Sequence, residues 1–332
     1  MTQLESAWEA LLGEPRQGEG WVVRRINTEA PVPLLAAVQQ PGGRIALHVE
    51  VAAESIASTA DYPSANGFEI FPEPVRPGPR GTVRLCLVHA GSRGVELFRF
   101  LAHDIALAVS RTDHALNVAS AIVDRLRVWQ GFFRRDTEGL TLEEQEGLFG
   151  ELLFLETLLE AGVGPDSAIA AWQGPVGAPR DFCFPACHIE VKAGTSRDGF
   201  FVSSLVQLDC DGPDVLILAY TELEEVPAGL SLPDIVSRIG NSLRTTSPRA
   251  VGAFNDRLLQ SGYLAAQSGG YSLRRWRVVR RFCFRVAEGF PRIRRAELPF
   301  GVEEVRYRVA LAACLPFQMP ELDAIELACR MA

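Results

Sequence analysis

Short runs of apolar or alternating residues dominate the first part of the chain, up to about residue 95. The runs WVVRRI, PVPLLAAVQ, RIALHVEV and TVRLCLVHA are separated by stretches rich in glycine and proline, such as QQPGG. Alternation with a period of two is typical of half-buried β-strands, and glycine with proline is typical of turns. We therefore predict a β-rich domain over residues 1–95, in which no motif indicates chemistry.

Apolar residues then recur at helical spacing. The stretches VELFRFLAHDIALAVS and ALNVASAIVDRLRVWQGFF predict two helices, which we assign to a helical connector over residues 96–140. A further helix is predicted in TLEEQEGLFGELLFLETLLEAG. Its start is marked by Thr141 and Glu144, which fit a capping box, and its end by Gly162.

Strand and helix patterns are mixed over residues 141–332, which we predict to be one domain. DFCFPACHIEVK is typical of a hairpin, VSSLVQLD of a helix and DVLILAY of a buried strand, in a βαβ-like order. SLPDIVSRIGNSL and AVGAFNDRLLQSGY predict helices, while LRRWRVVRRFCFRV and VEEVRYRVALAAC predict late strands. The fold class is therefore α/β (α+β), a mixed sheet flanked by helices beside a β-rich N-terminal domain.

The predicted hairpin has one apolar and one polar face. With Pro185–Ala186 at its tip, Asp181 opposes Glu190, and the polar face carries Asp181, Cys183, His188, Glu190 and Lys192. Opposed side chains in an antiparallel pair lie about 4.5–5.5 Å apart at Cβ, so two carboxylates there repel each other. A divalent cation such as Mg²⁺ offsets this repulsion and keeps water ligands that a substrate can replace.

Lys192 is the single lysine among 33 basic residues, since all the others are arginine. Its compact ammonium group can lose a proton in a suitable environment, whereas the guanidinium of arginine stays charged. A lysine that orients a catalytic water would explain why arginine is not used at this position. The alternative is that Lys192 forms an ordinary ion pair with Glu190 or Asp181.

Composition restricts the class of protein. The chain has 47% hydrophobic and 22% charged residues, and no apolar run near the ~20 residues that a membrane helix requires. The start, MTQLESAWEALLGEP, lacks the basic beginning and cleavage site of a signal peptide. We therefore expect a cytoplasmic protein without membrane association.

Positive charge is concentrated late in a chain whose net charge is −8. The segment RRWRVVRRFCFRVAEGFPRIRR mixes arginine with aromatic residues, which is compatible with a strand that has a solvated arginine face. It is equally compatible with a ridge that contacts phosphates. The candidate nucleic-acid-binding residues are Arg274, Arg275, Arg277, Arg280, Arg281 and Arg285.

Asp181 followed by Glu190-Val191-Lys192 resembles the D-x(n)-(D/E)-x-K signature of the PD-(D/E)XK nuclease superfamily. The surrounding GLFGELLFLETLL, AWQGPVGAPRDF and VSSLVQLD are similar to a family of uncharacterised bacterial PD-(D/E)XK proteins, often encoded near restriction and phage-defence genes. The resemblance spans roughly residues 95–320. One departure is that Arg180 precedes Asp181 where the signature has proline, with Pro179 one step earlier.

The resemblance implies a restriction-endonuclease-like core and assigns roles to individual residues. It implies that Asp181 and Glu190 are metal ligands, joined by Glu151 from the preceding helix, and that Lys192 positions or activates water. It also implies that Gln207 contacts DNA or the lysine. For Glu151 a helix cap or an exposed position is the alternative, and for Gln207 the alternative is an ordinary surface residue.

These observations lead to two competing functions. The first is a Mg²⁺-dependent DNA endonuclease, also able to use Mn²⁺, which cuts duplex DNA in a restriction or phage-defence system. The second is a catalytically inactive nuclease-like scaffold or adaptor within a multi-protein defence complex. A homodimer is expected if a single-site enzyme cuts both strands. His188 is either a general base or packs beside Cys183.

Overall fold

The structure, a computed structural model, describes residues 2–14, 18–26, 28–56, 62–75, 81–91, 94–133, 139–185, 187–209 and 215–329. The chain forms two compact units, unit 1 (Met1–Asp136) and unit 2 (Thr137–Ala332), each of which is described by itself. Within the described ranges, none of the helices combines the length and the apolar composition needed to cross a membrane.

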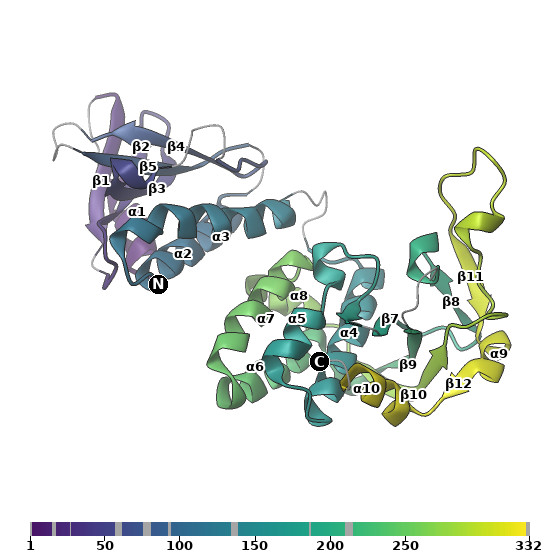
Figure 1. Cartoon of the computed structure of the whole chain (residues 1–332). Coiled ribbons are helices and arrows are strands. Elements are labelled where there is room, and N and C mark those ends of the chain that lie inside the picture. The colour runs from purple at the N-terminus through teal and green to yellow at the C-terminus, as the bar shows by residue number, and fades with distance from the viewer. Residues whose placement is uncertain are drawn as a thin grey trace. The chain divides into compact units, whose positions relative to one another are not determined.

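Unit 1 packs helices against one side of an antiparallel sheet (Figure 1). The strands pair in the order β1-β2-β3-β5-β4, with bounds β1 (Gly20–Ile26), β2 (Leu34–Gln40), β3 (Arg44–Ala52), β4 (Phe68–Pro74) and β5 (Thr82–His89). The helices are α1 (Gln3–Gly13), α2 (Val95–Ser110) and α3 (Val118–Phe133). Trp8 of α1 donates a 2.9 Å hydrogen bond to the carbonyl of Ala46 in β3, and its ring lies 6.2 Å from that of Phe98 in α2.

The sequence indicated most of unit 1 but missed two elements. β1, β2, β3 and β5 match the predicted runs, whereas β4 and α1 were not predicted. β4 contains two prolines, and proline in a sequence argues against a strand. β4 tolerates them because it is an edge strand, which pairs along only one side. α2 and α3, which the sequence analysis assigned to a connector, lie within unit 1, where Asp104 of α2 accepts a 2.7 Å hydrogen bond from the indole of Trp129 in α3.

Unit 2 is built on a mixed sheet, which confirms the predicted fold class. Its strand order is β12-β10-β9-β7-β6, with bounds β6 (Phe182–Phe184), β7 (Cys187–Gly194), β9 (Val215–Leu230), β10 (Trp276–Arg285) and β12 (Gln318–Met319). β7 and β9 are parallel, and the other neighbours are antiparallel. A separate two-stranded ribbon pairs β8 (Gly199–Val202) with β11 (Tyr307–Ala310).

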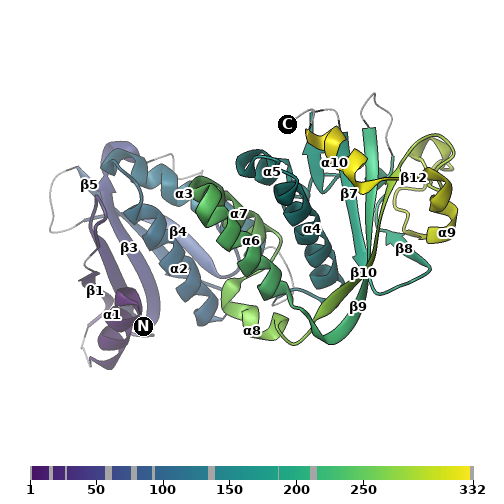
Figure 2. The same cartoon turned by 90° about the horizontal axis from the view of Figure 1, so that it is seen from below.

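Most of the helices of unit 2 lie on one side of this sheet (Figure 2). The helices of the unit are α4 (Leu142–Glu160), α5 (Pro165–Ala171), α6 (Leu232–Thr246), α7 (Pro248–Gln260), α8 (Ser268–Tyr271), α9 (Leu311–Cys314) and α10 (Glu321–Cys329). α4 begins at the predicted capping box of Thr141 and Glu144. It lies so close to β7 that a Cβ on Gly150 would stand 2.4 Å from the Cβ of Ala193. Glycine at this position therefore lets the helix approach the strand that carries Glu190 and Lys192.

Two predicted elements of unit 2 were wrong. VSSLVQLD does not form an α-helix; β8 ends at Val202 and a single 3₁₀ turn follows at Leu205–Gln207. So short a segment does not nucleate an α-helix unaided, and the N–H of Ser203 is instead bound by the side chain of Gln207. VEEVRYRVALAAC is a strand only over Tyr307–Ala310 and continues as helix α9.

Both faces of the unit 2 sheet are covered by apolar side chains. One core, which includes Phe182, Ile189 and Val191, lies between the sheet and the helices α4 to α7. The other, which includes Leu218 and Tyr220, lies between the sheet and the β8–β11 ribbon. Since Ile189 and Val191 of β7 face the helices, alternation directs the side chains of its polar residues toward the ribbon side.

Candidate active site

The predicted hairpin is formed by β6 and β7, in the register that the sequence indicated. Cys183 pairs with His188, and Phe184 pairs with Cys187. The predicted tip residue Ala186 lies outside the described residues. The hairpin therefore has the expected register, and its polar side chains form one wall of the candidate site.

Asp181 stands directly before β6 and is fixed by backbone groups. Its Oδ2 accepts a 2.7 Å hydrogen bond from the N–H of Val191 in β7. Its carbonyl oxygen accepts hydrogen bonds of 2.7 Å from the N–H of Gln173 and 3.0 Å from that of Gly174. The carboxylate is therefore held against the strand that carries Glu190, and its second oxygen faces Gly174.

Glu151 approaches the same point from helix α4. Its Oε2 accepts a 2.7 Å hydrogen bond from the indole N–H of Trp172, which is fully buried at the end of α5. A Cβ on Gly174 would lie 3.0 Å from this oxygen and 2.7 Å from Oδ1 of Asp181. Two carboxylate oxygens from separate elements thus border one small space that only a glycine leaves open.

Lys192 lies at the centre of the polar contacts of β7. Its Nζ is 2.8 Å from Oε1 of Glu190, whose side chain is only 2% exposed. The same ammonium donates a 3.0 Å hydrogen bond to Oε1 of Gln207, which also accepts the N–H of Ser203 at 3.0 Å. Gln207 therefore contacts the lysine, and a buried carboxylate and an anchored amide together orient the ammonium.

Burial raises the pKa of each of the three carboxyl groups. For Glu151 burial is the main cause, and the nearby charge of Asp181 adds to it, so that its pKa lies well above the ordinary value. The same two causes raise the pKa of Glu190 to about 8. Burial also raises the pKa of Asp181, against the hydrogen bond from Val191. Carboxylates that repel one another in a buried site favour a bound cation.

The donor set fits a hard divalent cation. Among the residues that the structure describes, no three His, Cys, Asp or Glu side chains are already gathered as a metal cluster. However, oxygens of Glu151 and Asp181 face one point at Gly174, and the buried carboxylate of Glu190, paired with Lys192, lines the same cleft. Carboxylate oxygens around open space are what Mg²⁺ prefers. These three residues are thus the candidate metal ligands.

The carboxylates open into a cleft of about 400 Å³. Its lining includes Tyr220, whose hydroxyl donates a hydrogen bond to the carbonyl of Ser196. Burial raises the pKa of Tyr220 to about 12, so this donor stays protonated at neutral pH. Phe201 and Arg306 line another part of the same cleft. The lining of the cleft therefore combines acidic, aromatic and basic groups.

Several residues of the site were not predicted individually. Trp172 and Gly174 lie in the segment AWQGPVGAPRDF, which the sequence analysis cited only for its resemblance. In a sequence, a tryptophan beside a glycine is typical of an ordinary hydrophobic core. Only the fold shows that Trp172 and Gly174 lie next to the carboxylates of Glu151 and Asp181. His188, by contrast, pairs with Cys183 and is not among the residues that line the cleft.

The arginine-rich strand β10 is largely neutralised by neighbouring carboxylates. Of the six candidate arginines, which lie in β10 or directly before it, five are in ion pairs, namely Arg274–Glu225, Arg275–Asp234, Arg277–Glu224, Arg280–Glu222 and Arg281–Glu321. The sixth, Arg285, is exposed, and no ion pair joins it to a carboxylate in the described part of the chain. Arg277 and Arg281 line a pocket beside Trp276, whereas Arg280 lies over the ring of Phe282. The arginines thus do not form one continuous basic ridge.

Comparison with known proteins gives one match. The family model described as "Putative PD-(D/E)XK family member, (DUF4420)" matches residues 4–312, nearly the whole chain. No curated protein and no solved structure matches the chain significantly. The match extends over both units, so the β-rich unit 1 is part of the family pattern and not an unrelated addition.

Proposed function

The chain belongs to this PD-(D/E)XK family, and from that premise we propose that it is a Mg²⁺-dependent nuclease that hydrolyses phosphodiester bonds in DNA. The observation that carries the proposal is the joint placement of Asp181, Glu190 and Lys192 in one cleft with Glu151. These residues come from a strand pair and a helix, and the cleft that they line is open to a substrate.

Each side chain has a role in the proposed reaction. Glu151, Asp181 and Glu190 would hold the cation, which when bound supplies Lewis-acid chemistry by lowering the pKa of water and offsetting charge on the phosphate. Lys192 would orient the attacking water, because its ammonium borders the cleft and is held by Glu190 and Gln207. Gln207 is thus a positioning residue that limits the rotamers of the lysine.

The single lysine fits this role better than an arginine would. Lys192 is only 14% exposed at its side chain and reaches two partners through one nitrogen. A planar guanidinium carries its donors on separate nitrogens, so it could not contact both partners through one nitrogen in the same space. The ion pair with Glu190, considered above as an alternative to a catalytic role, is here part of the catalytic arrangement.

The proposed setting is a restriction or phage-defence system, as the family resemblance suggests. Arg285, which is exposed and forms no ion pair with a described residue, would contribute a backbone contact, which carries no base information. Unit 1, in which no chemical motif is found, would then bind partner proteins that choose the target. A double-strand cut by this single site would require two copies of the chain.

Plasmid cleavage tests the proposal. The wild type is incubated with Mg²⁺ or Mn²⁺ beside Asp181→Ala, Glu190→Ala and Lys192→Ala. We expect the wild type to cut and the variants to lose at least about a hundredfold of the rate, in line with typical losses of a catalytic group. Equal activity in all four proteins would place any nuclease activity elsewhere.

A scaffold without activity is the second candidate, and one observation favours it. Lys192 already forms an ion pair with the carboxylate of Glu190, whose side chain is only 2% exposed. Thermal unfolding separates the two functions. If Mg²⁺ at millimolar concentration leaves the Tm of the wild type unchanged and, with Mg²⁺ still present, an Asp181→Asn, Glu190→Gln double variant is more stable than the wild type, the site is a degenerate nuclease site.

A further inference from the structure

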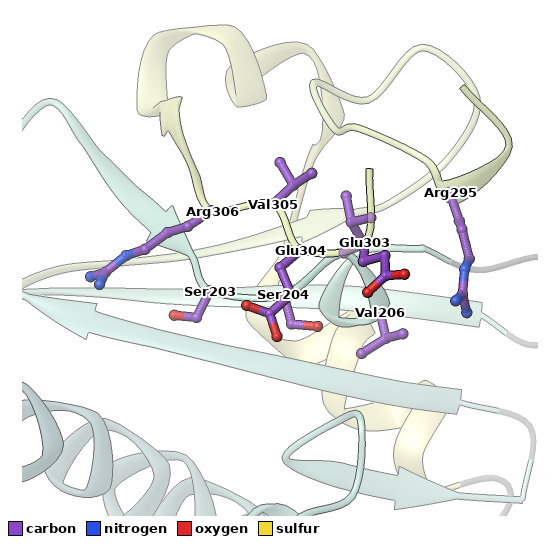
Figure 3. A pocket seen from close by; sticks show the side chains of 9 residues that line it. Ser203, Ser204, Val206, Arg295, Glu303, Glu304, Val305 and Arg306 are labelled. Atoms are coloured by element: carbon purple, nitrogen blue, oxygen red, sulfur yellow. The ribbon is translucent and has the colours of Figure 1, made fainter. Parts of the chain in front are cut away.

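A second pocket of about 620 Å³ adjoins the catalytic cleft. It lies between the segment that follows β8 and the segment that leads into β11 (Figure 3). Ser203 and Arg306 line both the pocket and the cleft. A ligand in the pocket would therefore be continuous with a substrate bound at the carboxylates.

An exposed aromatic residue of the cleft lies beside Arg306, which lines both spaces. Phe201 of β8 is 51% exposed, between the buried Phe200 and Val202, so it lies on the outer face of the ribbon. The guanidinium of Arg306 lies 5.1 Å from the centre of its ring. An exposed ring with a cation on it, at the edge of a catalytic cleft, is a platform on which a flat group can stack.

The charges of the second pocket favour a base over a phosphate. In Figure 3 the side chains of Glu303 and Glu304 point toward the segment of Ser204, with Arg295 and Arg306 at the two ends of the row. No ion pair joins either glutamate to a described residue. Free carboxylates repel phosphate but accept hydrogen bonds from the amino groups of bases. The centre of the pocket thus suits a base edge, and its ends suit the backbone.

We propose that Phe201 and the adjoining pocket bind one unpaired nucleobase next to the scissile phosphate. This inference rests on the proposed nuclease function and narrows its substrate class. A base inside a duplex is covered on both faces by its neighbours, so it reaches Phe201 only after leaving the stack. The preferred substrate is therefore single-stranded or locally unpaired DNA, in place of the intact duplex that the sequence analysis expected.

Binding without cleavage tests the substrate class. The full chain is titrated in EDTA into a fluorescein-labelled single-stranded 15-mer and into the matching duplex, and anisotropy gives Kd. We expect the single strand to bind at least about tenfold more tightly, and Phe201→Ala to lose about tenfold on the single strand alone, as for one stacked base. Phe201→Tyr should retain the affinity.

Two controls identify what the pocket recognises. Phe300→Ala removes another fully exposed aromatic ring, one that does not line either space, and should change nothing. Glu304→Gln should alter the preference among homopolymers of different bases. If it instead tightens binding to all of them equally, the pocket holds phosphate and the inference is wrong.

The outcome is separable from that of the nuclease proposal. Asp181-dependent cleavage of duplex plasmid, with equal binding of duplex and single strand and no effect of Phe201→Ala, overturns the base pocket and leaves the nuclease intact. Phe201-dependent binding of single strands without any cleavage supports the base pocket and overturns the nuclease.

Discussion

The indole N–H of Trp172 donates a 2.7 Å hydrogen bond to Oε2 of Glu151. Trp172 is fully buried, so the bond is protected from competition by water and restricts the carboxylate to one rotamer. The oxygen that it holds is also the one that faces Gly174. A residue of the core thereby orients a candidate metal ligand, as supporting shells commonly do.

Trp172→Phe should weaken divalent-cation binding. The substitution keeps most of the buried ring but removes the N–H that holds Glu151, so we expect Mn²⁺ affinity to fall by about tenfold. Isothermal titration with Mn²⁺ measures this directly. Trp276→Phe is the matched control, because the indole N–H of Trp276 is buried without a hydrogen-bond partner among the described residues. Equal affinities in both variants would mean that the bond does not position a ligand.

Gly174→Ala should abolish the metal site at little cost to the fold. The new Cβ would lie 2.7 Å from Oδ1 of Asp181 and 3.0 Å from Oε2 of Glu151, within the space proposed for the cation. We expect the increase in Tm on adding Mn²⁺ to disappear, since it depends on binding to the folded state.

Gly252→Ala provides the comparison for this variant. Gly252 lies in α7, and a Cβ there meets nothing within 4 Å. It should keep the full response of Tm to Mn²⁺. A Gly174→Ala protein that still responds would show that the cation binds somewhere else.

Glu190→Gln should stabilise the metal-free protein at high pH. Burial and Asp181 raise the pKa of Glu190 from 4.5 to about 8, so the folded state keeps a proton that the unfolded chain releases. Stability is therefore lost as pH rises between these values, and glutamine avoids that loss. We expect a gain on the order of 4 kcal/mol in the free energy of unfolding at pH 8.5.

Urea denaturation in EDTA at pH 4.5 and 8.5 measures this gain. At the lower pH the carboxyl group is protonated in the folded state and half protonated in the unfolded chain, so the two proteins should unfold at nearly the same urea concentration. A difference of the same size at both pH values would indicate a packing effect in place of titration.

Lys192→Arg should lose cleavage activity even though the substitution preserves the positive charge. The ammonium fits between Glu190 and Gln207 at 2.8 and 3.0 Å, and a guanidinium cannot repeat this geometry around one nitrogen. We expect the plasmid-cleavage rate to fall at least about a hundredfold. Arg249→Lys, an exchange in the reverse direction at an exposed position of α7, should leave the rate unchanged. If Lys192→Arg cleaves at the wild-type rate, the lysine contributes only its positive charge and does not orient the attacking water.

The hairpin was predictable because its information is local. Alternation in DFCFPACHIEVK determines which side chains share a face, and the register Cys183 with His188 follows from the short turn. The mixed sheet and the start of α4 followed from similarly local patterns. Helix-like spacing gave a wrong prediction only in the short segment VSSLVQLD. A segment of this length does not form an α-helix unaided, and the side chain of Gln207 binds the N–H of Ser203 instead.

What the sequence alone determined about this protein was therefore the set of polar residues on one strand pair and the order of elements around it. The meeting of Trp172 and Gly174 with that pair was decided only by tertiary structure, and so were the partners of the arginines at 274–281, whereas Glu151 was expected there from the family resemblance alone. The physical reason is that these contacts join elements far apart in the chain, and no periodicity records which distant carboxylate will face which side chain.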